Sequence, residues 1–419
     1  MQHFCGSQHE QTLFYSVIAP GKDRVNSMFW CGSATVIRRD ALLAVGGVLT
    51  DTVAEDFHTT IAMHAKGLRT RYHAETLAQG LAPHDLAAFL LQRHRWARDN
   101  LRVFRTPQNP LTCPRLTLAQ RVSYLASLLA YFSGLQRLLM LAVLVFTLLT
   151  GILPLTASPL ALAQLWLPWT LCSVVTSVGL ARGTLGPTDS TQYGLMTMGI
   201  DTRAVVGLLG RGSSTCKVTP KAGIDEGGAA VLRVVPLLTA TGGALLVAAA
   251  LRAATALGVG PLPPLHGFAL AIGAWELTWI VRTLAMLVRR HQLRAQYRFP
   301  VDLAGRVDDQ VVRVVDLSPT GSAIEHIGHH SLGDTIHLSL GPPAADGRTH
   351  EVSLPGEVRS IVGLDGEQSR VGCRLGATTP AAVDRLVEYC YIVEPVHSLP
   401  AEQKAGHTRM DREDYPAAS

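Results

Sequence analysis

The most prominent pattern in the chain is a long run of apolar positions near its middle. No charged side chain occurs between residues 138 and 181, a run about twice the roughly 20 residues that span the hydrocarbon core of a bilayer. Prolines 154 and 159 mark a turn within it. A second pair of apolar stretches follows. The pattern predicts four transmembrane helices, at about 134–153, 160–181, 231–256 and 266–288.

The segment before these helices has a mixed α/β pattern. Phe29–Ile37 is a short apolar run typical of a buried strand. Ala54–Lys66 and Leu86–Phe104 carry apolar residues at helical spacing, which predicts two amphipathic helices.

The segment after them alternates with a period of two. Gly, Pro and Asp interrupt the runs, which are Gln310–Val315, Thr335–Leu340 and Glu351–Leu354. This texture predicts a small antiparallel β domain. A helix at Ala381–Tyr391 is expected to close it, before a loose polar tail.

The distribution of charged residues predicts how the chain crosses the membrane. Charged residues make up only 16% of the chain, whereas a soluble globular protein usually has about 25%, which disfavours a wholly soluble enzyme. Positions 154–159 and 257–265 hold no Lys or Arg, while 98–121, 182–221 and 289–298 are rich in them. The positive-inside rule then predicts a multi-pass protein of the plasma (inner) membrane, with both soluble ends cytoplasmic. The seven cysteines form no CxxC pair, so neither a zinc site nor a disulfide framework is expected.

These patterns divide the chain into four parts. We expect a partial cytoplasmic domain, the membrane helices with a cytoplasmic loop at 183–230, the β domain, and a flexible tail. Their predicted bounds are 1–113, 114–293, 294–396 and 397–419.

Two polar motifs precede the membrane helices. Ala54-Glu55-Asp56 opens one predicted helix, and Gln92-Arg93-His94-Arg95-Trp96 lies inside the other. A carboxylate can deprotonate a hydroxyl, an arginine can stabilise a departing diphosphate, and an indole can stack on a sugar ring. The parts suit sugar transfer from a nucleotide donor. Each alone has a simpler reading, as a helix-dipole cap or an interfacial anchor.

Together with two further stretches, these motifs give a resemblance. Phe29-Trp30-Cys31-Gly32-Ser33 and Lys217-Val218-Thr219-Pro220-Lys221 complete the set. From about residue 12 to 396 the chain resembles the C-terminal part of a bacterial cellulose synthase catalytic subunit, a processive family 2 glycosyltransferase. The resemblance implies a partial α/β domain of the GT-A type. It also implies inverting transfer of glucose from UDP-glucose to a growing β-glucan, with export.

The resemblance also implies roles for particular residues. Asp56 would be the general base. Arg95 would contact the diphosphate and Trp96 would stack on the acceptor sugar, in a pocket that the neighbouring side chains complete. Gln92 and Arg93 would line this pocket, and the acceptor channel would be bordered by Cys31, Gly32 and Ser33. A gating loop would close over the donor through Lys217, Val218, Thr219 and Lys221.

The sequence departs from the family pattern at three points. Ala54 stands where the family usually has Thr, and Cys216 where its gating loop usually opens with Phe. No DxD motif, which in the family holds the nucleotide and its Mg²⁺, occurs before Cys31. We therefore expect a truncated or split gene product that needs a separately encoded N-terminal half for turnover. The family further implies a periplasmic accessory subunit, and no nucleic-acid polymer is expected as a partner.

A second constellation lies around the start of the β domain. Arg294 and Arg298 form RxxxR, and Asp316, Ser318 and Gly321 form DxSxxG. Two arginines can clamp phosphates and stack on guanine, and the motif's polar groups can bond guanine edges. The alternatives are a juxtamembrane basic stop and an ordinary turn. The pair resembles the PilZ domain, an antiparallel β-barrel that binds cyclic di-GMP, which would act here as an allosteric activator.

Some polar residues remain ambiguous. Glu276, inside a predicted membrane helix, either lines a polysaccharide channel or pairs with Arg282 or His266. Arg252 is expected to extend towards the membrane interface. Lys22-Asp23-Arg24 is expected to be an exposed turn.

Two functions from different classes stay open. The favoured one is a UDP-sugar-dependent glycosyltransferase of the cellulose synthase type. The alternative is a non-catalytic, membrane-bound cyclic di-GMP receptor or scaffold.

Overall fold

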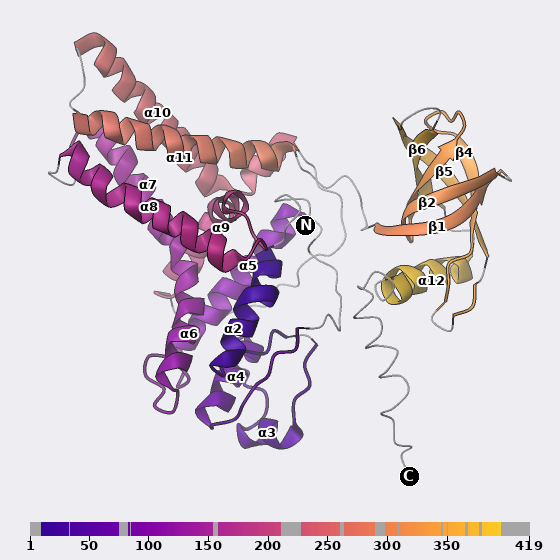
Figure 1. The fold of residues 1–419 in the computed structure, drawn as a ribbon, viewed down its shortest axis with the longest axis horizontal. Coiled ribbons are helices and arrows are strands. Elements are labelled where there is room, and N and C mark those ends of the chain that lie inside the picture. Colours follow the sequence, from indigo (N-terminus) through magenta and orange to yellow (C-terminus); the bar gives the residue numbers. More distant parts are fainter. Residues whose placement is uncertain are drawn as a thin grey trace. The chain divides into compact units, whose positions relative to one another are not determined.

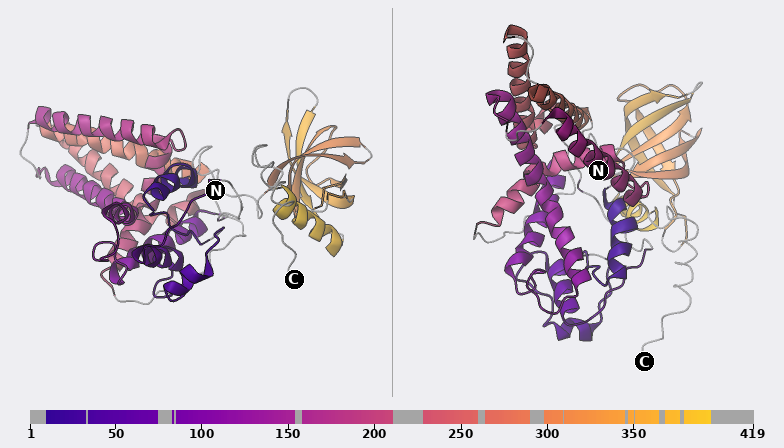
Figure 2. Two further views of the ribbon diagram at one scale, coloured as in Figure 1. Left: turned by 60° about the horizontal axis from the view of Figure 1, so that its bottom comes forward. Right: turned by 60° about the vertical axis from the view of Figure 1, so that its left-hand side comes forward.

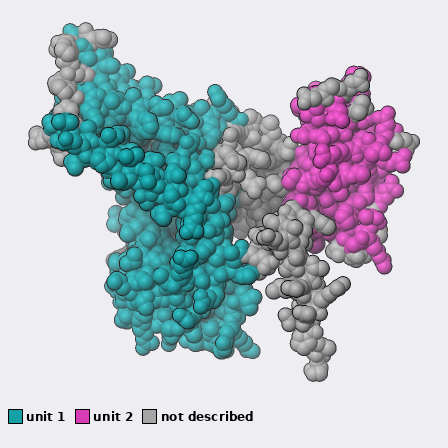
Figure 3. Space-filling model, in the orientation of Figure 1, with its two compact units in different colours: residues 1–74, 80–293 teal, residues 75–79, 294–419 magenta. Residues whose placement is uncertain are grey.

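The chain forms two compact units (Figure 3), one of residues 1–74 and 80–293 and the other of residues 75–79 and 294–419. The structure is a computed structural model. It describes residues 10–32, 34–74, 83, 85–153, 158–210, 228–259, 264–289, 298–308, 310–344, 347–349, 351–364, 368–376 and 379–394.

The first unit begins with short helices around a small core. These are α1 (Glu10–Leu13), a π-helical turn (Phe14–Ile18), α2 (Ala19–Arg24), α3 (Arg39–Ala44), α4 (Glu55–Ala65), α5 (Leu86–Leu101), a 3₁₀ turn (Arg102–Arg105) and α6 (Leu118–Leu129). Local capping fixes where two of them start. Asp85 accepts a hydrogen bond from Ala88 N at the start of α5, and Thr117 with Gln120 forms a capping box on α6.

The two predicted amphipathic helices are confirmed as α4 and α5. Their apolar faces share one buried cluster, in which Phe57 and Ile61 of α4 meet Leu101 of α5 and Tyr124 of α6. This shared core brings the first turn of α4 close to the middle of α5.

The predicted strand at Phe29–Ile37 is wrong. Gly32 has a φ of 74° and Ala34 one of 41°, so the backbone turns where a strand would run straight. Trp30 N donates to the side chain of Thr60 instead of a neighbouring strand. The described part of the first unit contains helices and irregular segments but no strand, so the α/β character expected there is not observed.

The four predicted apolar helices are present, within a few residues of the predicted positions. They are α7 (Ser133–Thr150), α8 (Pro159–Ala181), α10 (Pro236–Val259) and α11 (Pro264–Arg289). All four are long and apolar enough to cross a membrane. Figures 1 and 2 show them at one end of the unit, with α2 to α6 at the other.

Part of the loop predicted at 183–230 is a helix. α9 (Pro187–Gly207) buries Tyr193, Met196 and Met198 among the apolar helices, and a 3₁₀ turn (Gly228–Arg233) precedes α10. A Cβ on Gly134 of α7 would lie 2.9 Å from Met198 O, so the two backbones cross closely there. The sequence did not predict α9, because the apolar residues of this helix show only weak helical periodicity.

Polar residues within the apolar helices have specific partners. Arg252 Nε donates to Leu148 O (2.8 Å), and His266 Nε2 lies 2.9 Å from Gly151 O. Both side chains therefore bond carbonyls at the C-terminus of α7, where a helix leaves such groups unsatisfied. The expectation that Arg252 extends to the membrane interface stays a prediction, and in the fold the side chain reaches the end of α7. Glu276 interacts electrostatically with Arg137 of α7, a residue that neither of the expected pairings included.

The second unit is a closed antiparallel barrel with strand order β1-β2-β3-β6-β5-β4. The strands are β1 (Phe299–Val307), β2 (Gln310–Ser318), β3 (Gly321–Ile327), β4 (Thr335–Leu340), β5 (Val352–Gly363) and β6 (Gln368–Leu375). α12 (Pro380–Glu388) and a π-helical turn (Tyr389–Val393) follow. The expected β-barrel and its closing helix are confirmed.

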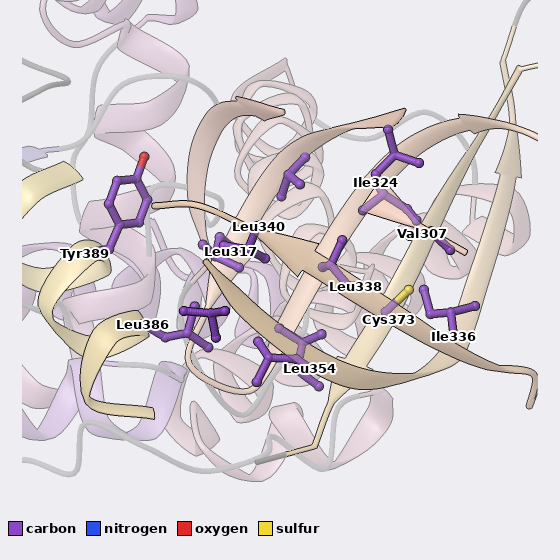
Figure 4. Packing of buried hydrophobic residues seen from close by; sticks show 14 of the residues in the cluster. Val307, Leu317, Ile324, Ile336, Leu338, Leu340, Leu354, Cys373, Leu386 and Tyr389 are labelled. Atoms are coloured by element: carbon purple, nitrogen blue, oxygen red, sulfur yellow. The ribbon is translucent and has the colours of Figure 1, made fainter. Parts of the chain in front are cut away.

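Alternation along the strands builds the barrel core. Figure 4 shows Leu317, Leu338 and Cys373 among the side chains gathered inside it. All three are fully buried, and Leu386 of α12 joins the same cluster. The core fixes the barrel's register and so places the turn between β2 and β3.

Candidate functional site

Asp56 lies in the first turn of α4, half-buried. Its Oδ1 accepts a hydrogen bond of 2.7 Å from Phe57 N. Burial raises the pKa of the Asp56 carboxyl above its ordinary value, and Glu55 adds to the rise, while the Phe57 N–H and Arg95 act in the opposite direction. A carboxylate in this setting takes up a proton more readily than an exposed aspartate.

The Cys31–Gly32 turn lies against this carboxylate. A Cβ on Gly32 would be only 3.0 Å from Asp56 Oδ2, and the φ of 74° is one that glycine adopts without strain. Thr60 Oγ1 ties the turn to α4, because it accepts from Trp30 N (3.1 Å) and donates to Asp56 O (2.7 Å). Glycine is therefore required here by both space and conformation.

Tyr15 adds a side chain that the sequence analysis missed. It is hydrogen-bonded to Cys31, and burial raises the pKa of each of the two groups to about 12. The nearby Asp56 charge contributes to the rise for Cys31. Tyr72 Oη donates to Tyr15 O (2.9 Å), which fixes the turn that carries it. No spacing or motif marks Tyr15 in the sequence, so only the fold reveals it.

α5 supplies cationic and aromatic groups. The guanidinium of Arg93 lies over the Trp96 ring, 4.3 Å from its centroid, and 5.0 Å from that of Phe89. Arg95 is close enough to Asp56 to favour its ionised form. Gln92 precedes Trp96 by one helical turn, and both side chains are half-buried.

Helix α5 is held against α9 by a polar contact. His94 Nδ1 lies 3.1 Å from Ile200 O of α9. This contact connects the motif to the helix that crosses α7.

Contacts thus bring together most of those predicted residues that the structure describes. One site is formed by Asp56, Cys31, Gly32 and Arg95. Tyr15 interacts electrostatically with Arg93 as well as with Cys31, and Arg93 in turn stacks on Trp96. Tyr15 therefore links Arg93 and Trp96 to this site. Five predicted residues lie outside the described residues, namely Ser33, Lys217, Val218, Thr219 and Lys221.

The described residues do not fit a metal ion. Among them, no group of three or more His, Cys, Asp or Glu side chains could hold one. The Mg²⁺ implied by the resemblance is therefore not assigned to any of the described residues.

The second constellation is assembled on the barrel. Arg298 Nη1 lies 3.1 Å from Asp316 Oδ1, and its Nη2 donates to Cys373 O at 3.2 Å. Ser318 Oγ donates to Gly321 O (3.0 Å), which closes the turn between β2 and β3. A Cβ on Gly321 would lie 2.7 Å from Arg298 Nη2, so the glycine makes room for the arginine. Arg294 lies outside the described residues.

Comparisons with known proteins agree with both constellations. Residues 12–176 match the model of glycosyl transferase family group 2, and residues 288–391 match that of the PilZ domain.

Several curated proteins are similar to this chain. The UDP-forming cellulose synthase catalytic subunit of Komagataeibacter sucrofermentans is 37% identical over 174 residues, 42% of this chain and 23% of that protein. That of Pseudomonas fluorescens is 40% identical over 169 residues, 40% of this chain and 23% of that protein. Cellulose synthase 1 of Komagataeibacter xylinus is 31% identical over 328 residues, 75% of this chain and 21% of that protein. The chain spans less than a quarter of the length of these relatives.

The contact of Gly32 with Asp56 gives a test on stability. Gly32→Ala is expected to lower the free energy of unfolding more than Gly67→Ala. Both glycines have a similar positive φ, 74° and 80°, but a Cβ on Gly67 meets nothing within 4 Å. The strained conformation alone costs about 1 kcal/mol, and the contact with Asp56 adds to it only at Gly32.

Thermal unfolding of the detergent-solubilised chain measures the difference. In an Asp56→Ala background the excess at Gly32 is expected to vanish. Equal losses at both glycines, or an excess that persists without the carboxylate, would contradict the geometry.

Proposed function

Because the chain carries a family 2 glycosyltransferase segment and a PilZ domain, we propose that it transfers glucose from UDP-glucose to a growing β-glucan. Transfer is inverting, is coupled to export, and is activated by cyclic di-GMP. The observation that carries the proposal is the meeting of Asp56, the Cys31–Gly32 turn and Arg95, from three separate segments, in a chain similar to cellulose synthases.

The reaction proceeds in one displacement. The acceptor hydroxyl oxygen attacks the anomeric carbon of the donor glucose, opposite the diphosphate. The bond to UDP breaks, and its electron pair leaves with UDP. Asp56 takes the hydroxyl proton, a role that burial favours because it raises the pKa of the carboxyl.

The neighbouring side chains bind and orient the reactants. Arg95 stabilises the charge that develops on the diphosphate, and Trp96 stacks on the acceptor sugar. Arg93 lies over the Trp96 ring and holds the indole in place. Gln92 and the segment Cys31–Ser33 line the acceptor side.

Donor binding needs further groups. A departing diphosphate requires several kcal/mol of charge stabilisation, which one arginine does not supply. We propose that a separate segment with the DxD motif and its divalent ion completes the site. The gating loop Lys217–Lys221 then closes over the donor, and a periplasmic accessory subunit receives the product.

The membrane helices provide the route of export. α7, α8, α10 and α11 cross the inner membrane, with both soluble parts on the cytoplasmic side. The glucan leaves the site of Asp56 and Trp96 by way of these helices.

The PilZ domain provides the control. Arg294, Arg298, Asp316, Ser318 and Gly321 bind cyclic di-GMP. In the barrel Arg298 is paired with Asp316, so dinucleotide binding exchanges this ion pair for phosphate and guanine contacts. The rearranged linker then frees the gating loop.

The alternative is a non-catalytic cyclic di-GMP receptor. It is supported by the PilZ motif, whose described residues Arg298, Asp316, Ser318 and Gly321 are brought together on the barrel.

Catalysis is tested with Asp56→Asn. Radiolabelled sugar incorporation in membranes of native host cells is expected to fall about 10²–10⁴-fold, because the base is removed.

The pH dependence gives a second test: the rate of the parent chain is expected to drop on acidification through the pKa of Asp56. That pKa lies above the ordinary aspartate value, so the loss begins at a higher pH than for an exposed aspartate. Glu55→Gln is the matched control and is expected to keep most of the activity. Undiminished incorporation in Asp56→Asn would contradict the proposal that Asp56 is the general base of a glycosyltransferase.

Dinucleotide binding is tested with Arg298→Ala. Titration calorimetry with cyclic di-GMP is expected to show at least about tenfold weaker binding, because charge-assisted hydrogen bonds to phosphate are lost. Arg359→Ala removes the same charge from β5, where Arg359 pairs with Glu357, and is expected to bind normally. Asp56→Asn is also expected to bind normally. Normal binding by Arg298→Ala would contradict the assignment.

A further inference from the structure

Lys22 is buried, contrary to the expectation of an exposed turn. It lies in the last turn of α2, and only 8% of the residue is exposed. Its Nζ donates to Ser123 O (2.9 Å) and lies 3.0 Å from Ser123 Oγ, both on α6. The side chain therefore joins two helices that are about a hundred residues apart in sequence.

The remaining surroundings of the ammonium are aromatic. Nζ lies 5.7 Å from the ring centroid of Phe29 and 6.0 Å from that of Tyr124. Phe29 begins the segment that leads to Cys31, and the ammonium interacts electrostatically with that thiol. Lys22 therefore lies beside the segment that leads into the Cys31–Gly32 turn.

The same lysine holds the turn that precedes this segment. Lys22 O accepts from Ser27 N at 2.9 Å, and Ser27 Oγ lies 2.7 Å from Ser123 Oγ. Asn26, at a φ of 52°, is fixed by Gln120 Nε2, which donates to its carbonyl oxygen (2.8 Å). Main chain and side chain of Lys22 therefore anchor both ends of the turn on α6.

Burying an ammonium among hydroxyl, carbonyl and aromatic groups is costly. Burial lowers the pKa of Lys22 to about 8, so the charged form is held at the expense of stability. An apolar side chain of similar length would fill the space without this cost. The lysine supplies donors that a methionine lacks.

We propose that Lys22 is a positioning residue of the acceptor site, which fixes the Phe29–Gly32 segment against Asp56 by joining α2 to α6 beside it. The inference rests on the proposed function for the identity of the acceptor. The geometric part, that Lys22 holds Cys31 in place, can be measured without turnover.

The test is the alkylation rate of Cys31 by iodoacetamide in the detergent-solubilised full chain, followed by mass spectrometry of its peptide. Lys22→Met keeps the length but removes the donors, and is expected to raise the rate at least threefold, because the segment loosens and exposes the thiol more often. Loss of the nearby cation alone would slow alkylation. An unchanged or lower rate would therefore overturn the proposal.

Two controls accompany it. Lys22→Arg retains a cation and donors and is expected to stay near the parent rate. Lys66→Met alters an exposed lysine at the end of α4 and is expected to change nothing. If Lys22→Met does not fold, Ser123→Ala, which removes one oxygen partner, is measured instead. Its rate is expected to rise, and an unchanged rate would overturn the proposal equally.

A second arm adds a cello-oligosaccharide. The saccharide is expected to protect Cys31 in the parent and in Lys22→Arg, but not in Lys22→Met, at equal thermal stability. Protection in Lys22→Met equal to that in the parent would overturn the positioning role. No protection in the parent would refute the proposed acceptor, while the saccharide-free rates still decide the role of Lys22.

Discussion

The close approach of the Cys31–Gly32 turn to the Asp56 carboxylate is the contact on which the candidate site depends. It requires a residue without Cβ at a positive φ, because a Cβ at this position would lie only 3.0 Å from Asp56 Oδ2. The carboxylate is also partly buried, and this burial raises its pKa. One glycine thus satisfies both the space and the backbone conformation beside a carboxyl group of raised proton affinity.

The rest of the first unit holds this contact in place. The shared core of α4, α5 and α6 brings Arg95 towards Asp56, while the contact of His94 with Ile200 O ties α5 to α9. α9 in turn crosses α7 at Gly134. The site is therefore linked through α9 to the apolar helices, as the proposed export of the product requires. The barrel is a separate unit, with its own core and its own arginine–aspartate pair.

The sequence predicted what strong local patterns determine. The apolar helices, the two amphipathic helices and the barrel strands follow from periodicity, and the motifs pointed to Asp56 and Arg298. It did not reveal Tyr15 or Lys22, because neither belongs to a motif and their roles come from contacts across the fold. Phe29–Ile37 had the composition of a strand but does not form one. Trp30 N donates to the Thr60 side chain, and the backbone turns at the positive φ of Gly32. The sequence also did not reveal that Arg252 bonds carbonyl groups at the end of α7.

The most direct measurement of the central contact is the pH dependence of Cys31 alkylation in Asp56→Asn. Burial raises the pKa of Cys31, and the adjacent Asp56 charge raises it further. Removing that charge should shift the alkylation profile to lower pH, while Glu55→Gln should leave it in place. A profile unchanged by Asp56→Asn would show that the turn and the carboxylate do not share a site.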